Sequence, residues 1–145
     1  MGTDRIERDI FIKAPVERVW TVLTSAGHLA QWFSETAELD LRPGGRLAVG
    51  WEEHGTGLGV VERVEEPHLL AWRWAHKAGL EVQDGNSTLV EFTLMPEGDG
   101  TRLRIVESGF DALDLPVEDR RKQREDNTGG WEIQGENLRA YAEQL

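Results

Sequence analysis

The clearest hydrophobic pattern in the chain lies in its carboxy-terminal stretch, residues 116–145. From Trp131 onward, apolar or small residues recur at helical spacing, in the order Trp131, Gly135, Leu138, Ala142, Leu145. Residues 118–127 are all polar, and Gly129-Gly130 separates the two halves. The pattern predicts one long helix whose second half packs on a core. Its first half must cover something other than a solid core.

Alternating apolar residues upstream of this helix predict an antiparallel sheet. The first strand is expected at residues 6–12, and two short helices follow before residue 33. Six further strands are expected, because the alternation resumes between turn signals such as Pro43-Gly44-Gly45. They are centred on residues 35–41, 47–51, 58–64, 70–74, 90–94 and 103–107. This order predicts an α+β fold in which a sheet of about seven strands wraps around the long helix.

Strand parity indicates which residues face the helix. In the strand at residues 58–64, Leu58, Val60 and Val64 are expected on the concave face. His76 and Glu107 are expected on that face at one edge of the sheet, about 10 Å apart, because one strand separates theirs and strands are spaced by about 4.8 Å. The two glycines at 129 and 130 are costly inside a helix, so we expect a close approach to the sheet or a hinge there.

Length and charge narrow the class of protein. With 145 residues, 39% of them hydrophobic, the chain is expected to form one domain, residues 1–145. The formal net charge is −11, from 16 basic against 27 acidic residues, which disfavours nucleic acid and anionic membranes as partners. No apolar run approaches the roughly 20 residues of a membrane span, and residues 1–8 lack a signal-peptide pattern, so a cytoplasmic location is expected.

The residue inventory also limits the chemistry. The chain has no cysteine, which removes disulfides, thiolate nucleophiles and zinc-thiolate sites. Its four histidines show no metal-ligand spacing, so neither a metal nor a cofactor is expected. The glycines at 55, 57 and 59 precede a strand rather than a helix, which is wrong for a phosphate-binding loop and favours bends in the sheet. The six tryptophans must lie either in the core or around a guest molecule.

Six segments, in order, resemble a known superfamily. They are residues 10–20, residues 29–33 (Leu-Ala-Gln-Trp-Phe), residues 42–46, Pro67 with residues 70–74, residues 107–110 (Glu-Ser-Gly-Phe), and Gly129-Gly130-Trp131 with Leu138 and Tyr141. Together they resemble the SRPBCC (START-like, helix-grip) superfamily, and within it the branch named after the activator of heat-shock protein 90 ATPase. The resemblance covers almost the whole chain.

This resemblance implies a helix-grip fold in which the long carboxy-terminal helix closes a deep, mostly apolar cavity. Members of the superfamily bind lipids, sterols, hormones or polyketide intermediates, and a minority catalyse cyclisation or aromatisation. The co-chaperone that names the branch is longer and carries an additional domain before the helix-grip one, and we expect no such domain in this protein. A stand-alone ligand-binding protein is therefore the expectation that we carry over.

The candidate ligand contacts are aromatic residues on the concave face, beneath residues 127–131. The expected lining is Trp51, Trp72, Trp74, Phe92, Glu107, Phe110 and Trp131, with Trp32 and Phe33 at the rim. Core packing is the alternative for each aromatic residue. We expect Glu107 to accept hydrogen bonds, to lie at the solvent-filled entrance of the cavity, or to have a functional role, because an unpaired inward carboxylate is costly.

The sequence is compatible with three different functions. The first is binding of an apolar or aromatic small molecule without a cofactor. The second is a cyclase- or aromatase-like lyase or isomerase that uses Glu107 as acid or base, with His76 assisting. The third is a co-chaperone-like interaction module whose acidic surface meets a basic partner. A homodimer formed through a sheet edge or the tryptophan-rich rim is compatible with all three.

Overall fold

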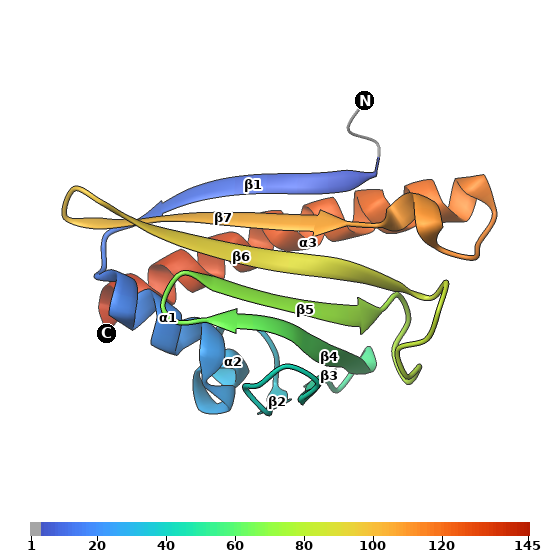
Figure 1. The fold of residues 1–145 in the computed structure, drawn as a ribbon, viewed down its shortest axis with the longest axis horizontal. Helices are drawn as coiled ribbons and strands as arrows, with labels where there is room; N and C mark the ends of the chain where they lie inside the picture. The colour runs from blue at the N-terminus through green and yellow to red at the C-terminus, as the bar shows by residue number, and fades with distance from the viewer. Residues whose placement is uncertain (1–3) are drawn as a thin grey trace.

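Residues 4–145, the part that the computed structural model describes, form a seven-stranded antiparallel sheet curved around one long helix (Figure 1). The strands are β1 (Arg5–Ile12), β2 (Thr36–Leu39), β3 (Arg46–Trp51), β4 (Gly55–Glu65), β5 (Leu69–Ala75), β6 (Ser87–Glu97) and β7 (Gly100–Ser108). The helices are α1 (Val16–Thr24), α2 (Ala26–Trp32), the short 3-10 helix η1 (Phe110–Ala112) and α3 (Val117–Gln144). Residues 1–3, part of the stretch expected to lack a signal peptide, lie outside the described residues.

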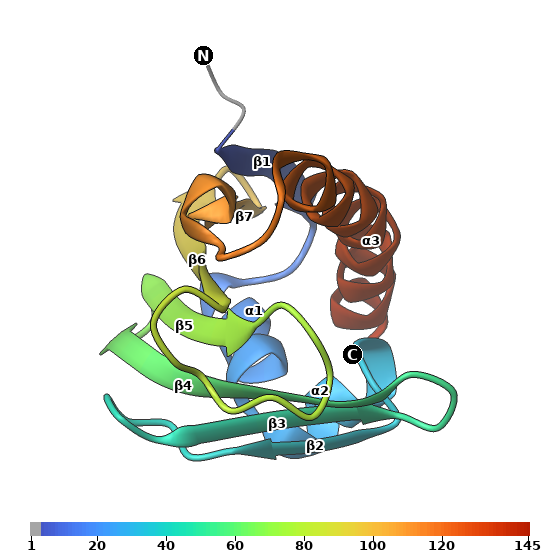
Figure 2. The ribbon, with the colours of Figure 1, turned by 90° about the vertical axis from the view of Figure 1, so that its right-hand side faces the viewer.

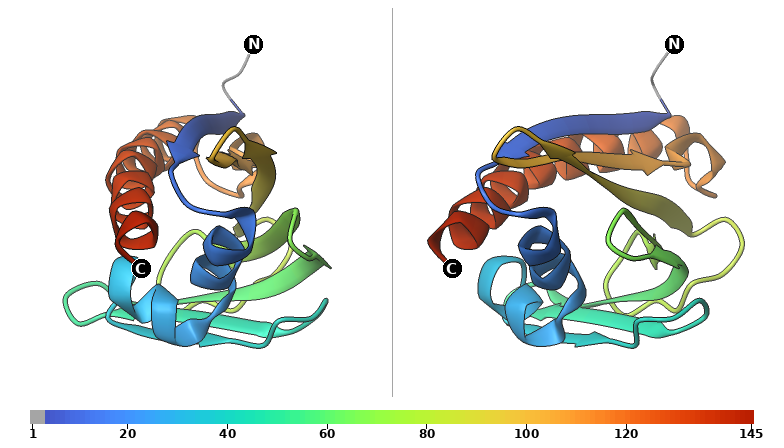
Figure 3. Two further views of the ribbon diagram at one scale, coloured as in Figure 1. Left: turned by 90° about the vertical axis from the view of Figure 1, so that its left-hand side faces the viewer. Right: turned by 60° about the vertical axis from the view of Figure 1, so that its left-hand side comes forward.

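The sheet order is β1-β7-β6-β5-β4-β3-β2, and every neighbouring pair is antiparallel. Strands β2 to β7 follow one another as a meander, whereas β1 pairs with β7 from the far end of the chain. The sheet bends so that β1 and β2 lie at opposite edges, and α3 runs along the concave side between them (Figure 2). Helices α1 and α2 lie near the carboxy-terminal end of α3 (Figure 3). This arrangement confirms the expected α+β helix-grip fold.

The core lies between the concave face and the second half of α3. The buried residues of α3 are Trp131, Gly135, Leu138 and Ala142, so the polar half of the helix does not contribute to the core. This confirms the predicted division of the helix at its glycine pair. The predicted apolar stripe was wrong at its last position, because Leu145 follows the end of α3 and its side chain is half exposed.

The close approach of α3 to the sheet occurs at Gly135 rather than at the glycine pair. A β-carbon added to Gly135 would lie 2.6 Å from Cδ1 of Ile10 on β1, whereas one added to Gly129 or Gly130 would meet nothing within 4 Å. A close approach at residues 129 and 130 was therefore the wrong expectation. Without a side chain at 135, the helix axis can come nearer to β1 than any larger residue would permit.

Strand β4 departs from simple alternation. Its register with β5 shifts between Val61 and Arg63, so Val61 is fully buried while Leu58 and Val60 are only half-buried. The predicted inward set of Leu58, Val60 and Val64 was therefore wrong in its first two members. Such a bulge changes which residues face the core and increases local twist, which suits a sheet that bends around a helix. Strand β2 is also shorter than the predicted residues 35–41.

None of the helices in residues 4–145 combines the length and apolar character that a membrane crossing requires.

Candidate functional site

A buried carboxylate, Glu107 on β7, joins the sheet to the first buried turn of α3. Its side chain is fully buried. Trp74 Nε1 and Thr88 Oγ1 donate to Oε2 at 2.9 and 2.6 Å, and Trp131 Nε1 donates to Oε1 at 2.8 Å. Asn127 Nδ2 lies 3.2 and 3.1 Å from the two oxygens. The sheet and the helix thus each supply two of the four donors to one carboxylate.

Strand register brings the sheet donors to Glu107. Trp74 on β5 lies opposite Thr88 on β6, and Val90, two residues further along β6, lies opposite Glu107 on β7. Side chains two positions apart on a strand share a face, so Thr88, Trp74 and Glu107 all point to the concave side. Their convergence follows directly from the antiparallel pairing of three consecutive strands.

Helical spacing brings the other donors. Asn127 and Trp131 are four residues apart on α3 and therefore project from one face of the helix. Gln123, one turn earlier, donates from Nε2 to Oδ1 of Asn127 at 3.1 Å. This bond leaves the amide nitrogen of Asn127 directed at Glu107, so the helix presents donors rather than acceptors to the carboxylate.

Among residues 4–145, no basic side chain forms a hydrogen bond or an ion pair with the Glu107 carboxylate. Its four partners are neutral, and three of them present N–H groups that only donate. Such donors suit an ionised carboxylate, which accepts through both oxygens. A buried carboxylate with this set of bonds is satisfied, whereas removal of one partner would leave a costly unpaired charge.

Three tryptophan side chains that border the cavity meet around Phe33, the residue that follows α2. The Phe33 ring lies 6.0 Å from the rings of Trp74 and Trp131, at interplanar angles of 14° and 19°. Trp74 and Trp131 are 5.9 Å apart at 21°. Trp51 meets Phe33 edge-on at 5.5 Å. Offset and edge-on arrangements of this kind are the favourable geometries for aromatic rings.

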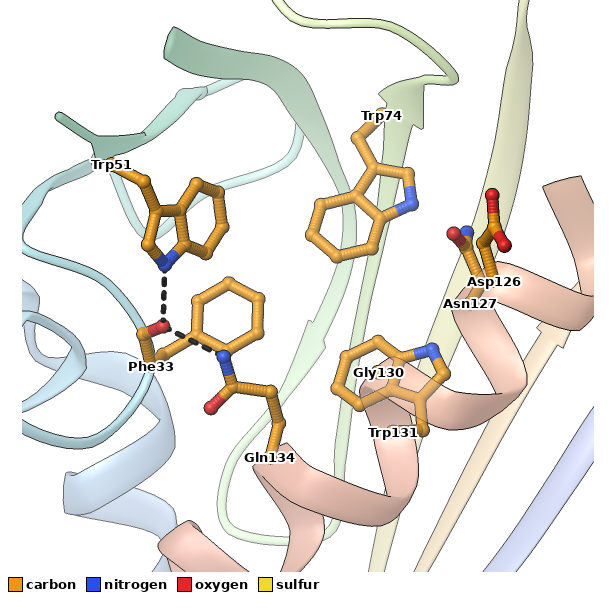
Figure 4. A pocket seen from close by; sticks show the side chains of 8 residues that line it. All are labelled: Phe33, Trp51, Trp74, Asp126, Asn127, Gly130, Trp131 and Gln134. Atoms are coloured by element: carbon orange, nitrogen blue, oxygen red, sulfur yellow. Dashed lines mark hydrogen bonds between the residues drawn. The ribbon is translucent and has the colours of Figure 1, made fainter. Parts of the chain in front are cut away.

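These rings border a small cavity, which we call the aromatic hollow (Figure 4). Its volume is about 160 Å³. Strands β3 and β5, helix α3 and the residue after α2 all contribute to its wall. The lining residues are Phe33, Trp51, Trp74, Asp126, Asn127, Gly130, Trp131 and Gln134.

A wider hollow of about 630 Å³ adjoins the aromatic hollow, and the two share Trp51, Trp74, Asp126, Asn127 and Gly130. Strands β3 and β4, the end of β5 and the first half of α3 form its walls. The polar first half of the helix, including Gln123, thus borders open space rather than packed core, as its sequence predicts.

Hydrogen bonds hold the rim of the aromatic hollow at one backbone atom. The carbonyl oxygen of Phe33 accepts from Nε1 of Trp51 at 3.2 Å and from Nε2 of Gln134 at 2.9 Å. Figure 4 shows both bonds, with Trp51 coming from β3 and Gln134 from α3. One carbonyl therefore ties together the end of α2, the sheet and the long helix.

The predicted contact residues fall into two groups, those that line a hollow and those that are buried outside both linings. Phe33, Trp51, Trp74 and Trp131 line the aromatic hollow, and His76 lines the wider one. The other predicted residues are buried and lie outside both linings: Trp32, Trp72, Phe92, Glu107 and Phe110. Trp72 packs between Phe92 at 4.9 Å and Trp74 at 5.6 Å, and Trp32 donates to the Val22 carbonyl.

The sequence analysis placed the cavity beneath residues 127–131, but among the α3 residues it named only Trp131 as a ligand contact. Asn127 lies four residues before Trp131 and Gln134 lies three residues after it, so both share its face of the helix. Gly130 is three residues after Asn127 and four before Gln134, and it therefore adjoins both. That spacing could have identified them once Trp131 was placed against the cavity. Asp126, next to Asn127, lines both hollows as well.

Within the described part of the chain, no group of three or more histidine, aspartate or glutamate side chains is arranged to hold a metal ion.

Comparison with known proteins gives one family. The family model described as activator of Hsp90 ATPase homolog 1-like protein matches residues 13–143. Among curated proteins, the search finds no match.

Solved structures share the fold over nearly the whole chain. Protein MLL2253 from Mesorhizobium loti is 26% identical, with a TM-score of 0.82 over 97% of this chain and 98% of that one. CalU16 from Micromonospora echinospora is 25% identical, with a TM-score of 0.73 over 95% and 75% of the two chains. The Aha1 dimer from Colwellia psychrerythraea has a TM-score of 0.77 over 96% of each chain; at 18% identity it shows the fold alone.

Proposed function

The chain belongs to the activator of Hsp90 ATPase homolog 1-like branch of the SRPBCC superfamily, and we propose that it is a small-molecule-binding protein. Its ligand is an apolar or aromatic group held in the aromatic hollow, between the sheet and α3. The observation that carries this proposal is the convergence of Phe33, Trp51, Trp74 and Trp131 on one cavity.

The lining of the aromatic hollow has the composition of a ligand site. Four aromatic side chains supply the apolar wall, while Asn127 and Gln134 place amide groups at its edge. Small-molecule sites combine a mainly apolar lining with a few fixed polar groups in this way. The volume of about 160 Å³ suits one ring or a compact branched group, and the wider hollow gives room for the rest of a larger ligand.

Glu107 supports this site as a positioning residue. Both of its oxygens already accept hydrogen bonds from the protein, and its side chain has no exposed surface. A general acid or base has to reach the proton that it moves, directly or through one water. We therefore favour binding over the cyclase-like alternative and assign Glu107 to orienting the indoles of Trp74 and Trp131.

The co-chaperone alternative draws on the family's name and on the acidity of the whole chain. The aromatic hollow is instead a specific place in the fold, with named residues whose contacts can be changed one at a time. We favour ligand binding for that reason.

The test is titration with small neutral aromatic compounds, such as indole and naphthalene, monitored through the tryptophan indole N–H resonances. The signals of Trp51, Trp74 and Trp131 are expected to shift with ligand concentration. Trp20, buried on α1 and outside both linings, is the internal control. Equal shifts at Trp20, or none at the three lining residues, would contradict the proposal.

A matched pair of glycine variants locates the binding site. Gly130 lines both hollows, whereas Gly129 lines neither, and a β-carbon at either position meets nothing within 4 Å. Gly130→Leu is expected to fill the entrance and weaken binding at least tenfold. Gly129→Leu introduces the same side chain one residue away and is expected to leave affinity unchanged. Equal effects of the two variants would place the ligand elsewhere.

A further inference from the structure

Two indoles that line the aromatic hollow share one anion. Trp74 and Trp131 both donate their Nε1–H groups to Glu107, one to each carboxylate oxygen. A hydrogen bond to an anion in a dry interior polarises its donor, moving electron density toward the ring. The faces of these two rings therefore become more attractive to a positive charge, and tryptophan is already the strongest cation–π partner among the side chains.

From this arrangement we propose that the aromatic hollow selects cationic ligands, namely compounds in which an alkylated ammonium group adjoins an apolar or aromatic body. The inference rests on the proposed binding function and specifies its ligand class. Trp51, Trp74, Trp131 and Phe33 surround the hollow from the sheet, the helix and the end of α2 (Figure 4). Aromatic walls on several sides are the recurring way in which proteins hold quaternary ammonium groups.

The charges around the two hollows favour the same ligand class. Among the described residues, the ionisable groups that line them are Asp126, His54 and His76, and neither lining includes lysine or arginine. Asp126 makes an ion pair with Lys122 at 3.1 Å, but both side chains are more than half exposed. Such a surface pair is weak, so the carboxylate remains available to a bound cation.

The dimensions and the overall charge fit this assignment. A volume of about 160 Å³ accommodates a trimethylammonium group, and the adjoining hollow of about 630 Å³ accommodates the body that carries it. The net charge of −11 also produces a negative potential that attracts cations toward the protein and repels anions.

The test compares three compounds of similar shape by calorimetry at physiological salt: phenyltrimethylammonium, its neutral carbon isostere tert-butylbenzene, and benzenesulfonate. We expect phenyltrimethylammonium to bind at least tenfold more tightly than tert-butylbenzene, and benzenesulfonate to bind most weakly. Equal or tighter binding of tert-butylbenzene would overturn the cation preference and leave the proposed function standing. Failure of both phenyltrimethylammonium and tert-butylbenzene, together with failure of the neutral aromatic compounds above, would overturn both proposals.

Variants separate the roles of the rings and the charge. Trp51→Leu is expected to weaken phenyltrimethylammonium binding about fivefold more than it weakens tert-butylbenzene binding, because only the cation loses a cation–π contact. Asp126→Asn is expected to weaken the cation about threefold, as for a partly exposed charge pair. Asp119→Asn, the same change on an exposed position of α3 outside both linings, is the matched control. Equal losses with Asp126→Asn and Asp119→Asn would contradict a local role for Asp126.

Discussion

The indole N–H of Trp131 on α3 reaches the carboxylate of Glu107 on β7 at 2.8 Å. Trp131 is also the first buried residue of α3, counted from its amino-terminal end. One side chain therefore forms the border between the packed half of the helix and the half that covers the hollows. The aromatic hollow lies at this border because the helix leaves the core there while the sheet continues.

Glu107→Gln is expected to lower the free energy of unfolding by about 2–4 kcal/mol. The amide adds an N–H group where all four neighbours donate, so at least one buried donor loses its acceptor. Urea denaturation followed by tryptophan fluorescence measures the effect. Glu91→Gln, on the outer face of neighbouring β6, is the control and should change stability by less than about 0.5 kcal/mol. Equal midpoints for the wild type and Glu107→Gln would refute the structural role of the carboxylate.

Asn127→Ala is expected to loosen the first half of α3 selectively. This half has no buried residue of its own, and Asn127 is its hydrogen-bonded link to Glu107. Amide hydrogen exchange should become faster in residues 117–130 and remain unchanged in residues 131–144, because local opening follows local contacts. Asp119→Ala, at an exposed position of the same half, serves as the control. Uniform acceleration along the helix would show that Asn127 supports global stability instead.

Alanine at position 129 and alanine at position 135 are expected to have opposite effects. Gly129→Ala should raise stability by about 0.5–1 kcal/mol, since the helix gains propensity and the β-carbon meets open space. In Gly135→Ala that gain is opposed by a contact of 2.6 Å with Ile10, so this variant should be less stable than Gly129→Ala by about 1–3 kcal/mol. Thermal and urea unfolding measure both. Equal stabilities of the two variants would mean that Ile10 on β1 moves aside for the added methyl group at no cost in free energy.

Tyr141→Phe is expected to cost about 1 kcal/mol. The Tyr141 hydroxyl and Nδ1 of His28 are 2.6 Å apart, and this bond joins α2 to the end of α3. A double-mutant cycle with His28→Ala should give a coupling energy of at least about 0.5 kcal/mol. Additive losses in the cycle would show that the hydrogen bond contributes nothing to stability.

The sequence was sufficient to predict the architecture but not how deeply each side chain is buried. Alternation predicts which face a strand residue occupies, and it placed Trp72, Trp74 and Glu107 on the concave face. It does not distinguish Trp72, which is fully buried under other rings, from Trp74, which lines the cavity. That difference arises from the curvature of the sheet and the position of α3, and neither leaves a local pattern.

Two other features could not be predicted from local sequence patterns. The bulge in β4 moves Val61 into the core, and no residue type in Val60-Val61-Glu62-Arg63 marks the shift. The four partners of Glu107 come from β5, β6 and α3, so only the assembled fold reveals that they meet. The need for a partner was predictable from the cost of a buried carboxylate, whereas the partners themselves were not.

The pairing of β1 with β7 also affects how the chain folds during its synthesis. Ile12 lies beside Thr101, and Arg5 lies beside Ser108. The first strand to be synthesised therefore gains its hydrogen-bonding neighbour only when the last strand has been made. Ribosomes add about 5–20 residues per second, so β1 emerges roughly 5–20 s before its neighbour exists. During that interval its backbone N–H and C=O groups are unpaired and its isoleucines are uncovered. The nascent chain is therefore most exposed to aggregation at this strand, and co-translational folding can finish only after β7 has left the ribosome.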